Sequence, residues 1–231
     1  MEPPHRTAPV EAGTTGPPTA IRISATLRER ITTGELAPGT RLKDSPLADE
    51  FGVSRNTLRD SLRQLEIDGL VISRRNAGYA VRMLTETDAH DIYQVRRTLE
   101  GAGVEATTRA SAQELDGLST CVTASRKAAR GGQWSQVGTH SLRLHQAIVA
   151  LLGSERFDSF FSNILAQLRL VFAVMDDEGT FQTQWIDRDD GLVKLLASGN
   201  RRQAHLELLQ YLADSEAQII DAIRVNGAKL Q

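Results

Sequence analysis

Three arginines spaced four residues apart can form one positively charged stripe along a helix. They are Arg55, Arg59 and Arg63, and Asn56 and Thr57 follow the first of them. Residues four apart share one face of an α-helix. A guanidinium can donate to both acceptors on a guanine edge in the major groove, and recognition helices present their N-terminal residues to bases, which here are Arg55, Asn56, Thr57 and Arg59. The stripe therefore has the chemistry of a reader of double-stranded DNA, with Arg63 better placed for a phosphate.

A helix-turn-helix would hold this stripe away from the protein. Ser54 is a suitable N-cap for the second helix. Leu58, Leu62 and Leu65 repeat at the spacing of a buried helical face. Gly52 provides the backbone freedom that the turn before this helix requires. The pattern predicts that the three arginines point to solvent while the leucines pack inward.

Shorter elements are expected on both sides of this unit. A short helix capped by Ser45 should run to Phe51. After the second helix, two apolar runs at 70–73 and 79–83 predict an antiparallel hairpin that turns near 76–78. The tip of that hairpin carries further groups suited to a phosphate backbone or a minor groove, namely Arg74, Arg75 and Asn76.

Residues 20–82 resemble the winged helix-turn-helix of GntR-type bacterial transcription regulators. The resemblance is carried by ITTGELAPGTRL at 31–42, LADEFGVSR at 47–55 and LRDSLRQLE at 58–66. It implies that the recognition helix contacts DNA through Arg55, Asn56, Thr57 and Arg59, and that Gly78 forms the minor-groove wing tip. Thr57 departs from the proline that many members have at this position.

The charge balance separates this region from the rest of the chain. The 231 residues carry a formal net charge of -2, which excludes indiscriminate electrostatic binding to nucleic acid. Residues 20–84 hold eleven Lys or Arg against eight Asp or Glu, a balance of +3, and residues 85–231 hold fifteen against nineteen, a balance of −4. The single cysteine, Cys121, excludes an internal disulfide framework and fits a cytoplasmic protein.

The remainder of the chain is predicted to be an antiparallel helical bundle. Six helices are expected, at about 85–110, 112–130, 133–151, 154–175, 182–198 and 200–225. In the fourth of them, helical spacing predicts a core of Phe157, Phe160, Phe161, Leu165, Leu168 and Phe172. We therefore expect a mainly α protein with a disordered leader at 1–19, a winged helix-turn-helix at 20–84 and an all-helical domain at 85–231.

This second region resembles the all-helical effector-binding domain of the FadR-like branch of the same family. The opening helix, DIYQVRRTLE at 91–100, carries the resemblance, together with LHQAIV at 144–149 and LLASGN at 195–200. Such domains often bind a small carboxylate above a divalent metal that one aspartate and three histidines hold. The matching positions here are Ser141, His145, Asp189 and Tyr211.

The ligand set for a metal is therefore incomplete, with only His145 and Asp189 of the usual type. His145 can instead be a pocket histidine bonded to a neighbour. Arg96 has two interpretations: it clamps an acid effector, as matching arginines of this branch do, or it pairs with Glu100 one turn away. Trp185 is expected to border the pocket or to pack in the core.

The function that fits these observations is a ligand-responsive transcription regulator, and more specifically a repressor. It would bind a pseudo-palindromic double-stranded DNA operator as a homodimer and respond to a small organic acid. We expect no membrane partner. Two alternatives stay open. One is a constitutive DNA-binding dimer without an effector, and the other is a metal-dependent enzyme in the bundle. No nucleophile and base can be paired from the sequence, so we expect no enzymatic activity.

Overall fold

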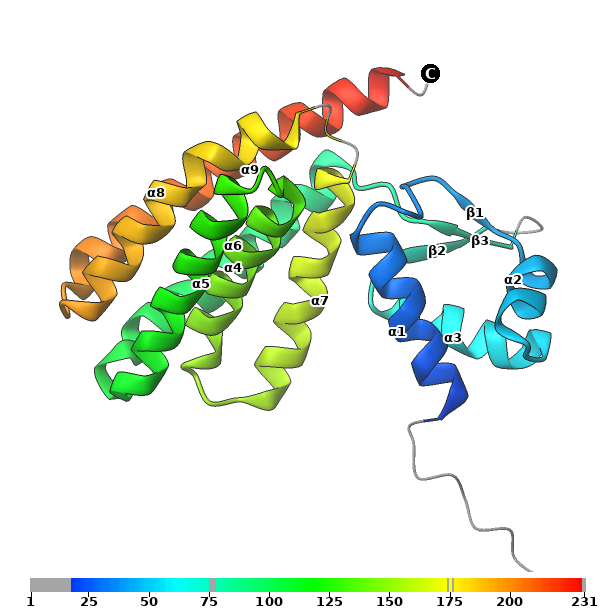
Figure 1. The fold of residues 1–231 in the computed structure, drawn as a ribbon, viewed down its shortest axis with the longest axis horizontal. Helices are drawn as coiled ribbons and strands as arrows, with labels where there is room; N and C mark the ends of the chain where they lie inside the picture. The colour runs from blue at the N-terminus through cyan, green and yellow to red at the C-terminus, as the bar shows by residue number, and fades with distance from the viewer. Residues whose placement is uncertain (1–17, 75–77, 174, 176, 230–231) are drawn as a thin grey trace, which may run out of the picture.

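The computed structural model describes residues 18–74, 78–173, 175 and 177–229, with side chains as far as Val225. Two units follow one another along the chain (Figure 1). The first, called the head, contains α1 (Thr19–Thr32), β1 (Arg41–Leu42), α2 (Asp44–Phe51), α3 (Arg55–Ile67), β2 (Val71–Arg74) and β3 (Gly78–Val81). The second, called the body, contains α4 (Glu86–Ala106), a 3-10 turn (Thr107–Arg109), α5 (Ala112–Arg130), α6 (Trp134–Ala150), α7 (Glu155–Phe172), α8 (Glu178–Ala197) and α9 (Arg201–Lys229).

The head is a winged helix-turn-helix, as predicted. Ser54 accepts a hydrogen bond from the Thr57 amide at 3.1 Å and so caps α3. The predicted inward residues of α3 are fully buried, namely Leu58, Leu62 and Leu65. Gly52 ends α2 with a φ of 63°, a left-handed conformation that a side chain disfavours. These local signals fix the angle between α2 and α3.

The wing is a small antiparallel sheet in the order β1-β3-β2. Ile72 pairs with Ala80, and Arg74 pairs with Gly78, so the predicted hairpin is present. Its turn, with Arg75, lies outside the described residues. The strand β1 was not predicted because two residues are too few for an alternating pattern.

One expectation about the head is wrong. The short helix does not begin with Ser45 as its N-cap, since α2 starts at Asp44 with Lys43 in the cap position. An acidic residue in the first turn interacts favourably with the positive end of the helix dipole. The Asp44 carboxylate accepts its hydrogen bond from Arg59 instead of from the backbone.

The body is the predicted helical bundle, and sequence-local caps define several of its helices. Capping boxes start α4 at Thr85 and α5 at Ser111. Asp177 caps α8, which therefore begins at Glu178 rather than at the expected residue 182. Within the described part of the chain, every helix is too short or too polar to cross a lipid bilayer.

The predicted core of α7 is only partly correct. Phe161 and Leu168 are fully buried, whereas Phe157 is 45% exposed and Phe160 is 50% exposed. These two rings are three residues apart, so they share a helical face that the rest of the bundle does not cover. Helical spacing identified apolar residues here without identifying which of them face the bundle.

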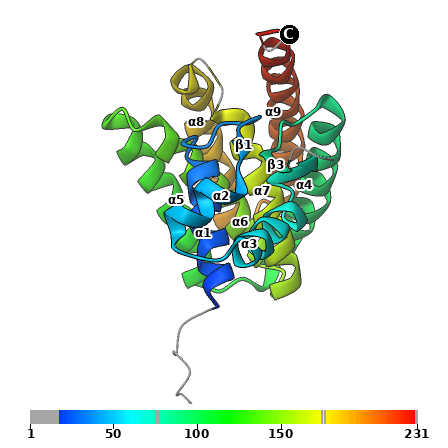
Figure 2. The same ribbon diagram turned by 90° about the vertical axis from the view of Figure 1, so that its right-hand side faces the viewer.

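Polar contacts join the head to the body along α7. Arg28 of α1 donates to Asp68 at the end of α3 and to Asn163 of α7, at 2.5 and 2.7 Å. Gln167 of α7 donates to the Asp68 carbonyl at 3.1 Å. Figure 2 shows α1 and α3 in front of α6 and α7. The two units therefore meet through hydrogen bonds as well as through apolar packing.

Candidate nucleic-acid interface and buried cavity

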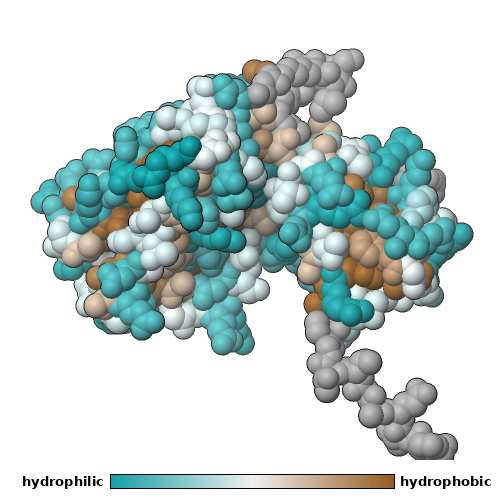
Figure 3. Space-filling view, in the orientation of Figure 1, coloured by the Kyte–Doolittle hydropathy of each residue, from teal (hydrophilic) through white to brown (hydrophobic). Residues whose placement is uncertain are grey.

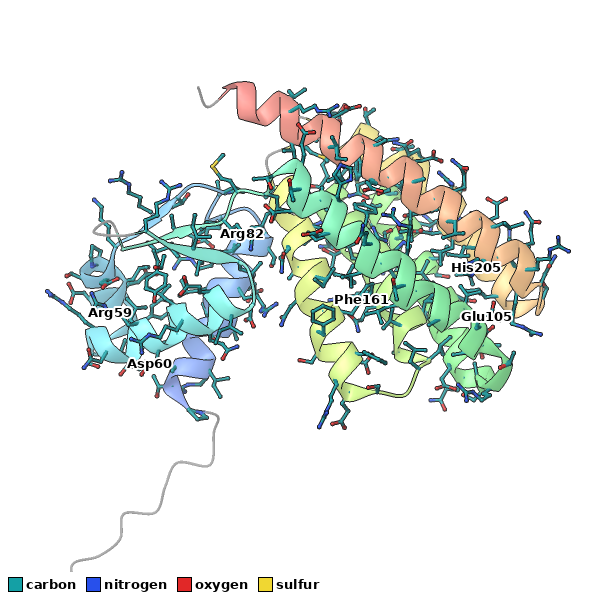
Figure 4. The ribbon with its side chains drawn as sticks, turned by 180° about the vertical axis from the view of Figure 1, so that it is seen from behind. Arg59, Asp60, Arg82, Glu105, Phe161 and His205 are labelled. Atoms are coloured by element: carbon teal, nitrogen blue, oxygen red, sulfur yellow. The ribbon has the colours of Figure 1, made fainter. Side chains whose placement is uncertain are left out.

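The outer face of α3 presents the predicted DNA-reading residues. Arg55, Asn56, Arg59 and Arg63 are exposed, and Figure 4 shows Arg59 and Asp60 on this helix at the far side of the head from the body. Thr57 is half-buried, and its hydroxyl lies 2.9 Å from that of Ser54. Thr57 therefore contributes to the helix start, which leaves the arginines and Asn56 as the protruding groups.

The three arginines of α3 differ in their partners. Arg59 donates from Nε to Asp44 Oδ2 at 2.7 Å, and this hydrogen bond raises the pKa of Arg59 above its ordinary value. Arg63 lies 3.4 Å from Asp60, a weak contact between exposed groups. Among the described residues, no acidic group pairs with Arg55. At the start of the helix, the Arg55 guanidinium is therefore available for DNA without first breaking an ion pair with a described residue.

The described part of the wing also faces solvent. Arg74 is exposed at the end of β2. Gly78, opposite it in the register, has a φ of 75°. A residue with a side chain rarely adopts this conformation, which explains a glycine at the base of the turn.

A small cavity lies inside the body among α4, α6, α8 and α9. Its volume is about 10 Å³, which is the space of one water molecule. Arg96, Ser141, His145 and Tyr211 line it. Asp189 adjoins it, with Oδ1 3.8 Å from His145 Nε2. The structure thus brings together all five residues that the family resemblance suggested for an effector pocket.

A buried ionic chain, in which Glu100 joins Arg96 to His145, lies beside this cavity. Arg96 Nε donates to Glu100 Oε1 at 2.7 Å, and His145 Nδ1 lies 2.6 Å from Glu100 Oε2. Burial alone would raise the pKa of Glu100, but Arg96 and His145 outweigh it and hold that pKa below its usual range. The intrahelical pair expected for Arg96 is present, and the same guanidinium also faces the cavity.

Several polar atoms around the cavity have no hydrogen-bond partner among the described residues. Three are donors, Arg96 Nη2, Gln182 Nε2 and Trp185 Nε1. The others are His145 Nε2 and Asp189 Oδ1. An unpaired buried donor costs about 1–3 kcal/mol, so such a cluster calls for a ligand or a water. Gln182 was not singled out from the sequence, because a glutamine near a helix start carries no distinctive signal.

The pKa of the second carboxyl group beside the cavity, Asp189, is shifted in the opposite direction to that of Glu100. Burial raises the pKa of Asp189 more than His145, Ser141 and Tyr211 lower it. Burial and the neighbouring Asp189 also raise the pKa of Tyr211 well above its usual value. Beside the cavity, the pKa of one carboxyl group, Glu100, is therefore lowered and that of the other, Asp189, is raised.

The side chains around the cavity do not form a suitable ligand set for a divalent metal ion. Among the residues that the structure describes around the cavity, His145 Nε2 and Asp189 Oδ1 are the suitable ligand atoms without a partner, whereas protein sites usually supply three or more ligands. Ser141 and Tyr211 provide neutral hydroxyls, which lie 3.4 Å from each other. The Arg96 guanidinium at the same cavity would repel a cation.

One arginine connects the wall of the cavity with the head. Arg169 of α7 is 7% exposed. Its Nε donates to the Thr32 carbonyl at 3.2 Å, its Nη2 donates to Ser135 Oγ at 2.8 Å, and its Nη1 lies 3.3 Å from Glu178. The guanidinium also lies over the ring of Phe172, which lines the cavity. A cleft of about 480 Å³ beside it separates α1 from α6 and α7, at the notch between the two units in Figure 3.

Comparison with known protein families finds two matches that together cover most of the chain. Residues 19–81 match the family described as bacterial regulatory proteins, gntR family. Residues 91–214 match the FCD domain.

Individual relatives agree with these matches. YdhC of Bacillus subtilis, an uncharacterized HTH-type transcriptional regulator, is 33% identical over 140 residues. A gluconate operon transcriptional repressor of Bacillus licheniformis is 37% identical over 97 residues. The matched regions span 60% and 42% of this chain, and 61% and 40% of those two relatives.

Solved structures extend the likeness over nearly the whole chain. A GntR transcriptional regulator from Rhodococcus sp. RHA1 superposes with a TM-score of 0.82 at 32% identity, and the match covers 88% of this chain and 98% of that one. McbR/YncC of E. coli has a TM-score of 0.77 at 16% identity, covering 89% and 99%. The second likeness concerns the fold alone.

Proposed function

The chain belongs to the GntR family of bacterial transcription regulators and carries an FCD domain, and from this premise we propose that it is a repressor controlled by a small organic acid. It binds a pseudo-palindromic operator as a homodimer. We place it in the cytoplasm, where bacterial DNA lies. Residues 20–84 bind DNA, and residues 85–231 bind the effector and form the dimer. The effector proposal is supported by the buried hydrogen-bond donors around the cavity that have no partner among the described residues.

For DNA, we assign base contacts to the beginning of α3. Arg55, Asn56 and Arg59 are exposed there, and recognition helices present their first residues to base edges. Thr57, half-buried and in contact with Ser54, supports the start of the helix that presents them. Backbone contacts fall to groups further along the helix and in the wing, namely Arg63, Arg74, Arg75 and Gly78.

For the effector, we assign a carboxylate to the donors of Arg96, Gln182 and Trp185. Each has a buried nitrogen that finds no partner in the described part of the chain, and a carboxylate can accept from all three. Ser141, His145, Asp189 and Tyr211 surround the same space and would contact the remainder of an acid. Because Glu100 already holds Arg96 by Nε, the guanidinium can bind the ligand through Nη2 without turning.

For the dimer, the exposed rings on α7 offer a surface. Phe157 and Phe160 share one face and are each about half exposed. In a two-fold interface the same patch is used by both protomers, so two such faces would cover each other. This arrangement would leave both recognition helices free to meet two half-sites of an operator.

DNA binding is tested by selecting duplexes from a random pool with the purified full-length chain. We expect a pseudo-palindromic consensus. Arg55→Ala should lose about 1–3 kcal/mol of discrimination at one base pair of each half-site. Arg130→Ala is the matched control, because it removes the same charge from an exposed position on α5. An unchanged consensus with both Arg55→Ala and Arg59→Ala would contradict the assignment of α3 as the reading helix.

Effector binding is tested by thermal unfolding in a panel of mono-, di- and hydroxycarboxylic acids. An acid at one hundred times its Kd stabilises the protein by about 2.7 kcal/mol, and Trp185→Phe should weaken this effect because it removes one donor. The cavity of about 10 Å³ favours a second candidate function, a constitutive repressor without an effector. That candidate gains if no acid in the panel stabilises the chain.

A further inference from the structure

Asp44, at the start of α2, contacts the recognition helix although it belongs to another element. We propose that Asp44 is a positioning residue that sets the base specificity of Arg59. It holds the guanidinium by one side and aims the opposite side at the DNA. This inference rests on the proposed role of α3 as the DNA-reading helix.

The geometry of the pair leaves the DNA-binding groups of Arg59 available. Asp44 Oδ2 accepts from Nε at 2.7 Å. In the described part of the chain, no hydrogen bond engages either Nη atom of Arg59. A guanidinium has five N–H groups, four of them on the two Nη atoms. The Nη groups are therefore free for a bidentate contact with a guanine edge.

Asp44 is also less exposed than Arg59, as expected for a residue that positions the arginine without contacting the DNA itself. The Asp44 side chain is 19% exposed, whereas that of Arg59 is 59% exposed. Asp44 Oδ1 is buried and has no partner among the described residues. The carboxylate is therefore recessed in the head and committed to Arg59, while the guanidinium extends into solvent.

The element that carries Asp44 is itself firmly held. Leu47 and Ala48 of α2 are buried in the head core, and the turn at Gly52 links α2 to α3. An arginine fixed by such a neighbour loses fewer rotamers when it binds. A freely moving Arg59 would instead have to be ordered by the DNA, and it could donate to phosphates as readily as to bases.

The proposal predicts opposite changes in specific and non-specific binding when Asp44 is removed. The specific contact loses its orientation, so the preference at the base pair read by Arg59 should fall at least tenfold. Affinity for an unrelated duplex should stay equal or rise, because a negative charge near the phosphates has been removed. A residue that only supported folding would lower both affinities together.

The experiment uses the full-length chain and the duplex selected by the wild-type protein. Arg59→Ala first identifies the base pair at which preference depends on Arg59. Asp44→Ala and the isosteric Asp44→Asn are then titrated against that duplex, against its substitutions at the same base pair and against an unrelated duplex. The double variant of Asp44→Ala and Arg59→Ala should lose no more preference than Arg59→Ala alone.

Glu50→Ala is the matched control. Glu50 is on the same helix and pairs with Arg30 at 2.8 Å, away from Arg59. Its removal changes the charge equally and should leave every base preference intact. Full retention of the Arg59-dependent preference in both Asp44 variants would overturn the proposal, as would an equal loss for all duplexes. A preference lost with Arg55→Ala but kept with Arg59→Ala would also overturn it and would leave the proposed function standing.

Discussion

Arg169 of the body donates from Nε to the carbonyl oxygen of Thr32, the last residue of α1 in the head, across 3.2 Å. The same side chain holds Ser135 at the start of α6 and Glu178 at the start of α8. One guanidinium therefore joins the end of the first head helix to two helix starts beside the cavity. A ligand that moved α8 would change the position of the group that holds α1.

Loss of this contact should loosen the end of α1. With Arg169→Gln, the Thr32 carbonyl, Ser135 and Glu178 lose their common donor, and each hydrogen bond is worth about 0.5–1.5 kcal/mol. We expect amide hydrogen exchange in residues 29–36 to accelerate about tenfold, which corresponds to about 1.4 kcal/mol. Arg126→Gln is the control, because the ion pairs of Arg126 among the described residues are with Asp187 and Asp190, both in the body. Equal exchange in both variants would contradict the role of Arg169.

Phosphate contacts should appear in the salt dependence of DNA binding. Arg63→Ala or Arg74→Ala should weaken binding to all duplexes by similar factors, because a phosphate carries no sequence information. Each variant should reduce the slope of log K against log salt by about 1 per protomer. Titrations at several salt concentrations measure this slope. A change in base preference with either variant would show that the residue reads a base.

Glu100→Gln should destabilise the body strongly at neutral pH. It leaves Arg96 buried without a charged partner, which typically costs about 3–5 kcal/mol. Because the pKa of Glu100 is lowered in the folded state, its contribution is complete above about pH 4.5 and is lost as the pH falls. The gap in unfolding free energy between the wild-type protein and this variant should therefore shrink on acidification, as urea titrations at pH 7 and pH 4 would measure.

Asp189→Asn should show the opposite trend. The pKa of Asp189 is raised in the folded state, so the folded protein holds that proton more tightly than the unfolded chain does. Its stabilising contribution is complete below about pH 4 and is lost as the pH rises through the folded pKa. The variant should thus gain stability relative to the wild-type protein between pH 4 and pH 7. A constant difference over this range would contradict the raised pKa.

Phe160→Asp should convert a dimer into a monomer. The substitution puts a charge into the face that Phe157 and Phe160 would share with a second copy, and a buried unpaired charge is strongly unfavourable. Light scattering on a sizing column gives the mass directly. Ile67→Asp is the control, since Ile67 is 78% exposed in the head. A dimer that persists with Phe160→Asp places the interface elsewhere.

Local signals were sufficient for the head and most helices of the body. Ser54 and Gly52 determine their own neighbourhood, so the turn and the start of α3 could be predicted. The N-cap prediction for Ser45 was wrong because α2 begins one residue earlier, at Asp44, and the cap residue, Lys43, makes no side-chain cap hydrogen bond. Gln182 and the orientation of Phe160 depend on how helices pack against one another, which no local pattern contains. For Arg96, the pairing with Glu100 could be predicted from a spacing of four, whereas the His145 contact to the same carboxylate required the fold.

The small size of the cavity leads to a kinetic expectation for the proposed effector. A space for one water cannot admit an acid of several carbon atoms while the bundle stays closed. Entry then waits for a transient opening, and the apparent affinity is reduced by the fraction of time spent open. At high concentrations of the acid, the association rate should level off at the opening rate instead of rising in proportion.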